Sequence, residues 1–317
     1  MKKLFVTALF LGGIVSYAQN TINNTKMEKK EIIRLVYPQW QGGDIAKLVP
    51  EISNSEDASR GYFLGANLLN FLAPDNGQES LIVPISTEVT ERKIINGVLD
   101  RDVIVQQTST ALKMLEQRNP NKIVTLGGEC SVSVVPFTYL ANKYNNDVAM
   151  IWIDAHPDIT LPGDSYAGYH AMAVTACMGY GDKKIISALP ARFGASKILL
   201  VGVRNWEREE IKARQKQYGI KHLSKEDIQQ NNNAIREWLK SCGASKVVIH
   251  FDLDVLDPSE IIAAVGTDSN GMKIEEVVRV INDIATEKEV VGLTIAEPMP
   301  RIAMRLQKLL ENMPLLK

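Results

Sequence analysis

The sequence lacks an excess of charge of either sign. Its 317 residues include 36 Lys and Arg against 37 Asp and Glu, a net charge of −1. Without a positive potential to hold a polyanion, the chain is not expected to bind nucleic acid. Hydrophobic residues make up 45% of the chain, which provides for a sizeable core and excludes disorder and collagen-like repetition.

Cysteine is also scarce. The three cysteines, Cys130, Cys177 and Cys242, lie far apart and none has CxxC spacing. This pattern excludes a disulfide scaffold, although one bridge between two of the three remains an alternative in an oxidising compartment.

Long apolar runs are absent after the start of the chain, which excludes a protein with several membrane spans. Lys2 and Lys3 precede an apolar run at residues 4–15, and small residues, Ser16 and Ala18, follow it. This pattern predicts a secretory signal peptide at residues 1–18, and an amphipathic helix of a cytosolic protein is the alternative. We expect an exported protein, periplasmic or secreted, with a polar segment at residues 19–30.

Short apolar runs alternate with longer segments of helical pattern along the rest of the chain. The predicted strands are 33–37, 81–85, 122–126, 148–153, 197–203, 246–252 and 290–295, and the predicted helices are 61–72, 102–118, 133–144, 205–218, 231–242 and 274–287. Strands that are apolar throughout are typical of a parallel sheet covered on both faces. We predict a single α/β domain at residues 31–317, with three α/β/α layers and a mainly parallel central sheet.

Two predicted strands end in clusters of carboxylates. The first runs into Asp154, His156 and Asp158, and the second into Asp252 and Asp254. Residues two apart on an extended chain share a face, so each cluster can converge on one point. Buried carboxylates cost several kcal/mol each unless cations meet them, and two such clusters favour a pair of cations over one. A polar loop without a metal is the alternative for the first cluster.

A third strand ends in two glycines, Glu129 and Cys130. The glycines permit a tight turn, and a cysteine at the start of the following helix is a candidate metal ligand whose thiolate the helix dipole favours. The alternative is a small buried thiol that only packs the turn.

Two further residues are candidates for the reaction itself. Glu297 ends the last strand and offers the paired oxygens that suit a guanidinium. His170 lies in a loop long enough to fold back over the site, where an imidazole would move a proton near pH 7. A solvated carboxylate and a surface histidine are the alternatives.

In this order and spacing, the motifs GGEC, DAHPD, the His170 loop, DLDVLDPS and AEP resemble the ureohydrolase family of arginases and agmatinases. The resemblance implies an arginase-like fold, a homo-oligomer and two manganese ions bridged by a hydroxide that attacks a guanidinium carbon. It implies that Glu297 orients the guanidinium and that His170 shuttles a proton to the leaving amine. It implies a metal-ligand set of Cys130, Asp154, His156, Asp158, Asp252 and Asp254, with Asp154 and Asp252 between the two ions.

Two departures from the family pattern concern the metal and the substrate. Where relatives usually read GGDH, this chain has Glu129 and Cys130, and a thiolate is more at home with zinc, iron or cobalt than with manganese. The positions at which arginases hold an amino-acid carboxylate correspond to Thr160 and Tyr166. Glu207 is either a contact for a substrate amine or a charge in the first turn of a helix.

Three functions are compatible with these motifs. The first is a metal-dependent hydrolase that acts on a small guanidino compound and releases urea. The second keeps the site but cleaves a formimino compound or another linear amidine. The third is a degenerate metal-binding protein in which Cys130 disables one ion position.

Overall fold

A sheet of eight parallel strands forms the middle of the molecule. The computed structural model describes residues 32–315 apart from 46–47, 50–54, 89–90 and 311. The predicted signal peptide and the polar segment at residues 19–30 lie outside the described residues. The strand order is β2-β1-β5-β10-β9-β6-β7-β8, and every described pair in this sheet is parallel. The prediction of a mainly parallel sheet is confirmed.

The strands follow the apolar runs closely. Their bounds are Ile32–Tyr37 (β1), Glu79–Ile82 (β2), Lys122–Gly127 (β5), Val148–Ile153 (β6), Ile198–Val201 (β7), Lys221–Leu223 (β8), Lys246–Asp252 (β9) and Glu289–Ala296 (β10). Every residue of β6 is buried, because helices cover both faces of the sheet. A central strand between two layers of helices therefore requires apolar side chains on both of its faces.

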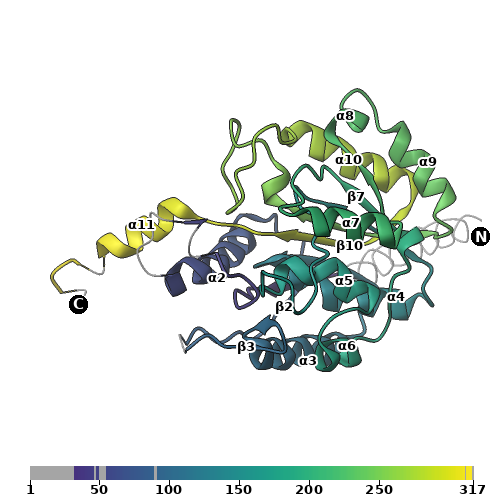
Figure 1. Ribbon diagram of the computed structural model, residues 1–317. Helices are drawn as coiled ribbons and strands as arrows, with labels where there is room; N and C mark the ends of the chain where they lie inside the picture. The colour runs from purple at the N-terminus through teal and green to yellow at the C-terminus, as the bar shows by residue number, and fades with distance from the viewer. Residues whose placement is uncertain (1–31, 46–47, 50–54, 89–90, 311, 316–317) are drawn as a thin grey trace, which may run out of the picture.

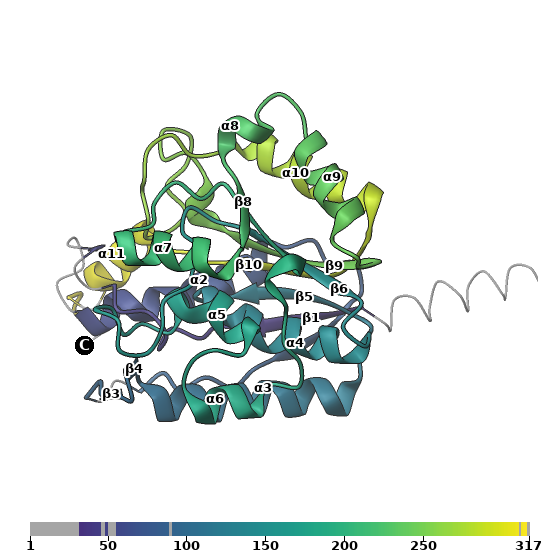
Figure 2. The same cartoon turned by 45° about the vertical axis from the view of Figure 1, so that its right-hand side comes forward.

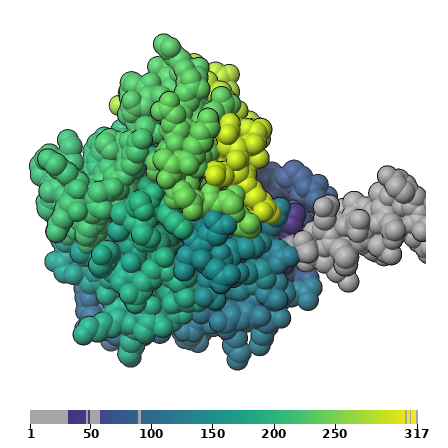
Figure 3. All heavy atoms as spheres, turned by 90° about the vertical axis from the view of Figure 1, so that its right-hand side faces the viewer, coloured from purple at the N-terminus to yellow at the C-terminus, as the bar shows by residue number. Residues whose placement is uncertain are grey.

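Helices form a layer on each face of the sheet (Figures 1 and 2). The α-helices are Ser55–Leu72 (α2), Arg101–Arg118 (α3), Val134–Lys143 (α4), Ala173–Met178 (α5), Lys183–Ala188 (α6), Glu209–Tyr218 (α7), Lys225–Ile228 (α8), Asn233–Ser241 (α9), Ile274–Glu287 (α10) and Arg301–Leu310 (α11). One apolar core joins α3, α4 and α5 to the sheet, and a second core joins α9 and α10 to the opposite face. In the space-filling view, the green and yellow surface of the later segments lies above the blue and teal surface of the earlier ones (Figure 3).

Several elements differ from the expectation. A small antiparallel hairpin pairs Ile94–Ile95 (β3) with Val98–Leu99 (β4), and its Asn96-Gly97 turn has positive φ at both residues, the turn chemistry that a two-residue hairpin needs. Strand β8 and helices α5, α6, α8 and α11 were not predicted. Helix α7 begins at Glu209 rather than at 205, because the preceding residues form a loop instead.

Close backbone approach at the carboxyl edge of the sheet depends on a glycine. A Cβ atom on Gly128 would lie 1.8 Å from the carbonyl oxygen of Gln39, so only glycine lets the loops after β5 and β1 meet. The loop after β1 is thereby held at the edge where the polar residues gather. Among the described residues, no helix combines the length and the apolarity that crossing a bilayer requires.

Candidate metal centre

The predicted site residues come from the carboxyl ends of four neighbouring strands. In the order β5-β10-β9-β6, these strands lead into Cys130, Glu297, Asp252 and Asp154 respectively. Parallel strands end at one edge of a sheet, and the loops that begin there form the usual ligand site of such folds. The structure brings together all eight predicted site residues, which line a single cavity or border it.

One group of possible ligands lies toward the cavity mouth. We call Asp154, His156 and Asp254 the outer cluster; each offers a ligand atom within 4.8 Å of the others. The Nδ1 atom of His156 lies 2.9 Å from Asp254 Oδ2 and 3.6 Å from Asp154 Oδ1. Its Nε2 atom lies 3.5 Å from Asp268 Oδ2, so the imidazole stands among three carboxylates.

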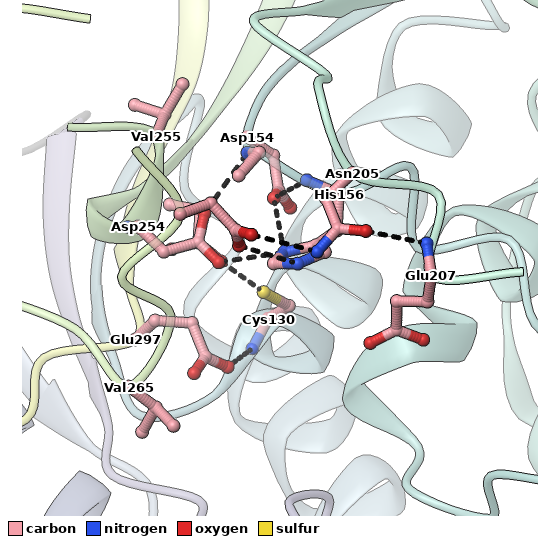
Figure 4. Close-up of polar contacts among 12 residues, drawn as sticks. Cys130, Asp154, His156, Asn205, Glu207, Asp254, Val255, Val265 and Glu297 are labelled. Carbon is pink, nitrogen blue, oxygen red and sulfur yellow. Dashed lines mark hydrogen bonds and ion pairs between the residues drawn. The ribbon is translucent and has the colours of Figure 1, made fainter. Parts of the chain in front are cut away.

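A second group lies deeper. We call Cys130, Asp154, His250 and Asp252 the inner cluster; one ligand atom from each lies within 4.8 Å of the others, and all four residues are buried. The Cys130 thiol donates a hydrogen bond to Asp252 Oδ2 at 2.9 Å. Asp154 belongs to both clusters, which is the position that a carboxylate between two cations requires. Figure 4 shows Cys130, Asp154, His156 and Asp254 converging on one region.

Hydrogen bonds hold the shared and inner carboxylates in place. The indole Nε1 of Trp152 donates to Asp154 Oδ2 at 2.8 Å, and the backbone N–H of His156 donates to Asp154 Oδ1 at 2.6 Å. In the same way, the backbone N–H of Asp254 donates to Asp252 Oδ1 at 2.6 Å. These donors fix the direction of each carboxylate before any ligand is present.

Asp158 returns to the site through a left-handed backbone conformation. Its φ is 49°, a region that few non-glycine residues adopt, and such conformations concentrate at functional sites. The side chain lines the cavity, and its Oδ2 atom is buried without a hydrogen-bond partner among the described residues. A buried carboxylate oxygen left in this state fits a cation ligand.

The pKa values separate the two clusters. Burial raises the pKa of Asp252 well above its usual range, and the neighbouring charges of Asp254 and Asp154 raise it further. Burial and the charge of Asp154 raise the pKa of Asp158 in the same way. The pKa of Asp254 is instead lowered despite burial, because the imidazole of His156 compensates its charge. At Asp252 and Asp158 no such partner outweighs burial, so the donor set fits divalent cations.

The environment of Cys130 differs from the expectation. Cys130 begins a short 3-10 turn, Cys130–Ser133, and not the first turn of an α-helix. Burial raises the pKa of its thiol well above the usual value, and the charges of Asp158 and Asp252 raise it further. The predicted dipole-stabilised thiolate is therefore wrong for the protein without a cation, although the sulfur does lie among the metal-ligand candidates.

Glu129 is a positioning residue rather than a ligand. Its buried carboxylate accepts hydrogen bonds from Gln39 Nε2 at 2.6 Å and from the Ser131 backbone N–H at 2.7 Å. A Cβ atom on Gly42 would lie 2.3 Å from Glu129 Oε1, so Gly42 leaves room for this carboxylate. The network connects the loop after β1 to the turn that carries Cys130.

His170 and Glu297 face each other across the cavity floor. His170 Nδ1 lies 3.3 Å from Glu297 Oε1, which also accepts the backbone N–H of Cys130 at 3.1 Å. The Tyr166 hydroxyl lies 2.6 Å from His170 Nε2. Burial lowers the pKa of His170, but Tyr166 and Glu297 outweigh it and raise the pKa well above the usual value. The surface alternative for His170 is wrong.

The cavity has a volume of about 350 Å³ and carries acidic groups near its mouth. Glu207 and Asp268 line it, and the described lining contains no Lys or Arg. Glu207 lies outside α7 with a φ of 57° and is linked to Asn205, which accepts its backbone N–H at 2.8 Å (Figure 4). The helix-charging alternative for Glu207 is therefore wrong. Thr160 also lines the cavity.

Two residues of this region were not predicted. His250 lies in β9, two residues before Asp252 on the same face, and its spacing was the signal that could have revealed it. Asp268 comes from the loop before α10, where the sequence shows no periodicity, so only the fold places it beside His156. The nearby Trp40 does not line the cavity. Its ring packs against buried residues near α2 and so stabilises the loop after β1.

Comparisons with known proteins agree on one family. A family model described as the Arginase family matches residues 80–308. An arginase of Entamoeba histolytica is 26% identical over 249 residues, which cover 74% of this chain and 81% of that protein. An arginase of Staphylococcus aureus is 30% identical over 176 residues, which cover 52% of this chain and 57% of that protein.

Solved structures share the fold. The Entamoeba histolytica arginase in complex with L-ornithine has a TM-score of 0.68 at 18% identity and covers 86% of this chain and 92% of its own. The formimidoylglutamase of Bacillus subtilis has a TM-score of 0.60 at 18% identity and covers 87% of this chain and 84% of its own.

Proposed function

The chain belongs to the arginase family, and on that premise we propose that it hydrolyses a small guanidino compound at a binuclear metal centre and releases urea. The observation that carries the proposal is the pair of clusters that share Asp154, set in the floor of a cavity beside Glu297 and His170. Asp252 is buried beside a neutral thiol, and two divalent ions would compensate the carboxylates of both clusters.

The residues divide into ligands for two ions. Cys130 and Asp158 would hold one ion, His156 and Asp254 the other, with Asp154 and Asp252 between them. The oxygen-rich outer cluster suits manganese, while the sulfur at Cys130 admits zinc, iron or cobalt. When bound, the ions make water a nucleophile near neutral pH and stabilise negative charge that develops on the substrate.

Glu297 orients the guanidinium. Its φ is 64°, and the backbone N–H of Cys130 holds one of its oxygens at 3.1 Å. A carboxylate fixed in this way presents paired acceptors that match the forked N–H groups of a guanidinium. The planar substrate is therefore held with its carbon facing the ligand clusters.

His170 gives a proton to the leaving amine. Because Tyr166 and Glu297 raise its pKa, the imidazole carries a proton at neutral pH and can donate it. The hydrogen bond to Tyr166 fixes the ring at the edge of the cavity, within reach of a group that Glu297 holds.

The substrate tail is expected to carry an amine rather than a carboxylate. Glu207 and Asp268 are acidic, and no Lys or Arg lines the described cavity to meet an anion. An amine between these two carboxylates would gain charge-assisted hydrogen bonds. We expect ω-aminoalkylguanidines to be better substrates than guanidino acids.

Product analysis tests the function. Purified protein loaded with manganese, zinc, iron(II) or cobalt is offered a panel of guanidino and formimino compounds, and urea, formamide and ammonia are measured separately. Urea from a guanidino compound supports the proposal, and formamide or ammonia from a formimino compound replaces it with the second function. One bound ion or none, without any turnover, would support the degenerate protein.

We also propose export and self-association. The pattern at residues 1–18 supports cleavage after Ala18, which the mass of the mature protein after cell fractionation tests. Exposed apolar side chains on α11, among them Ile302, Leu306 and Leu309, support a homo-oligomer. Light scattering coupled to size-exclusion chromatography measures the number of subunits.

A further inference from the structure

His250 is a buried imidazole that the proposed reaction leaves without a task. Its exposed fraction is 0%, and it lies on β9 two residues before Asp252. Its ring stacks on that of Trp152, with centroids 3.6 Å apart and an interplanar angle of 8°. The stacking fixes the plane of the imidazole, in which both ring nitrogens lie.

The two ring nitrogens have different surroundings. Nδ1 lies 2.7 Å from the hydroxyl oxygen of Ser133. Nε2 is buried and has no hydrogen-bond partner among the described residues. A buried polar atom in that state is costly, and a ligand is one explanation for its retention.

The ring belongs to the inner cluster. One nitrogen of His250 lies within 4.8 Å of the ligand atoms of Cys130, Asp154 and Asp252. We propose that His250 binds the inner cation through Nε2, together with Cys130, Asp154 and Asp252. This inference deepens the proposed function and rests on its binuclear centre.

Ser133 and Trp152 serve as positioning residues for this ligand. When Nδ1–H donates to the Ser133 hydroxyl, the lone pair of the imidazole is left on Nε2, which is the form that binds metals. Trp152 stacks on the ring and also donates to Asp154 Oδ2 at 2.8 Å. One indole thus orients an imidazole ligand and a carboxylate ligand of the same ion.

The two clusters then differ in metal preference. With His250 added to Cys130 and to the carboxylates of Asp154, Asp158 and Asp252, the inner donor set contains a thiolate and an imidazole, and these softer ligands favour zinc, iron(II) or cobalt over manganese. The outer cluster offers one imidazole and carboxylate oxygens, which suit manganese better. The proposal therefore predicts two unlike cations in one centre.

Metal binding to the full-length mature protein tests the proposal. Zinc affinity is measured by calorimetry, and the sulfur-to-cobalt charge-transfer band is followed during an anaerobic cobalt titration. His250→Asn should weaken zinc binding at one of two sites by more than about 100-fold, because even residues that only orient ligands contribute 10–100-fold. Ser133→Ala should weaken it by about 10-fold.

His222→Asn is the matched control. His222 lies on β8, away from both clusters, and bonds Gln215 through Nδ1 at 2.9 Å. This variant should keep wild-type zinc affinity and the wild-type cobalt band. Wild-type affinity in a folded His250→Asn protein would overturn the proposal.

X-ray absorption of the wild-type protein keeps the proposal testable if His250→Asn fails to fold. With one zinc per chain, sulfur and imidazole should both scatter in the shell of the same ion, and the imidazole signal should persist in His170→Asn. A zinc shell with sulfur and no imidazole would overturn the assignment. If His250 proves necessary for zinc while no guanidino compound is hydrolysed, the proposed function fails and the ligand assignment stands.

Discussion

The two clusters of the centre differ in how their charges are compensated. In the outer cluster, the side chain of His156 is 21% exposed and lies 2.9 Å from Asp254, so the carboxylate already has a partner. In the inner cluster, Asp252 is 2% exposed and accepts a hydrogen bond from the neutral thiol of Cys130. Asp254 therefore has a partner without an ion, whereas Asp252 keeps the cost of a buried charge unless a proton or a cation neutralises it.

Replacing one carboxylate in each cluster should give the largest effects and is the most direct test of whether the two clusters differ in charge compensation. Asp252→Asn should lower urea release by more than about 1,000-fold, since charge stabilisation of the reaction is lost. Without metal, the same variant should unfold at a higher temperature than wild type, because a buried uncompensated charge is removed. Asp254→Asn should unfold at a lower temperature, because it removes the nearest of the three carboxylates around the His156 imidazole. The measurement is thermal unfolding in the presence of a chelator. Equal shifts of the unfolding temperature in both variants would contradict the difference between the clusters.

Without metal, the stability of the folded protein should depend on pH, because its buried carboxylates then bind protons. In the metal-free protein, burial and the charge of Asp254 raise the pKa of Asp154 from 3.8 to about 7. The folded state therefore holds more protons than the unfolded state between these values, and stability should fall as pH rises from about 4 to about 7. The slope for one such group is at most about 1.4 kcal/mol per pH unit.

Metal loading should reverse that trend, because the ion replaces the proton on the carboxylates. Ion concentrations 100-fold above Kd should also add about 2.7 kcal/mol of stability. Unfolding temperatures across this pH range, with and without chelator, measure both effects. Metal-free stability that rises with pH in this range would refute the account of the inner cluster.

The residues beside the inner cluster should respond next most strongly. His170→Asn should lower kcat by about 100-fold or more, within the usual range for a lost general acid. Tyr166→Phe should lower kcat less and should move the alkaline limb of the kcat profile to lower pH, since Tyr166 raises the pKa of His170. The measurement is a pH–rate profile of each variant, and an unmoved limb in Tyr166→Phe would contradict the assignment.

Replacing the residues beside the outer cluster should give the smallest effects, and these should be confined to substrate binding. Asp268→Asn and Glu207→Gln should each raise KM for an amine-tailed guanidine by about 10-fold or less, as expected for one exposed charge contact, and should leave kcat nearly unchanged. A neutral alkylguanidine of equal length is the control substrate. A change in kcat with unchanged KM would place these carboxylates in the reaction instead.

The sequence predicted the parts of this site that follow from strand geometry. Asp154, His156, Asp252 and Asp254 were found because alternation along a strand places residues two apart on one face. The central strands were found because a sheet covered on both faces selects continuous apolar runs. His250 follows the same alternation, but it lies within an apolar run whose pattern predicts only a buried strand.

Other features depend on loops whose conformation has no period. The contact between Tyr166 and His170 requires the loop after β6 to fold back, and Asp268 reaches His156 only through the loop before α10. The left-handed conformations of Asp158, Glu207 and Glu297 are imposed by tertiary contacts at residues that disfavour them. No local sequence pattern predicts these conformations.

The order of strands has a consequence for how the chain folds. Strand β10 is the last in sequence, yet it lies between β5 and β9 in the middle of the sheet. The turn that carries Cys130 follows β5, and Asp252 ends β9, so these ligands meet only after the final strand has inserted. Such long-range pairing is slow, and a growing chain holds no complete centre until nearly all of it has been made. Insertion of β10 is the event that completes the inner cluster, because β6 and β9 pair directly and carry Asp154 and Asp252, whereas Cys130 joins them only across β10.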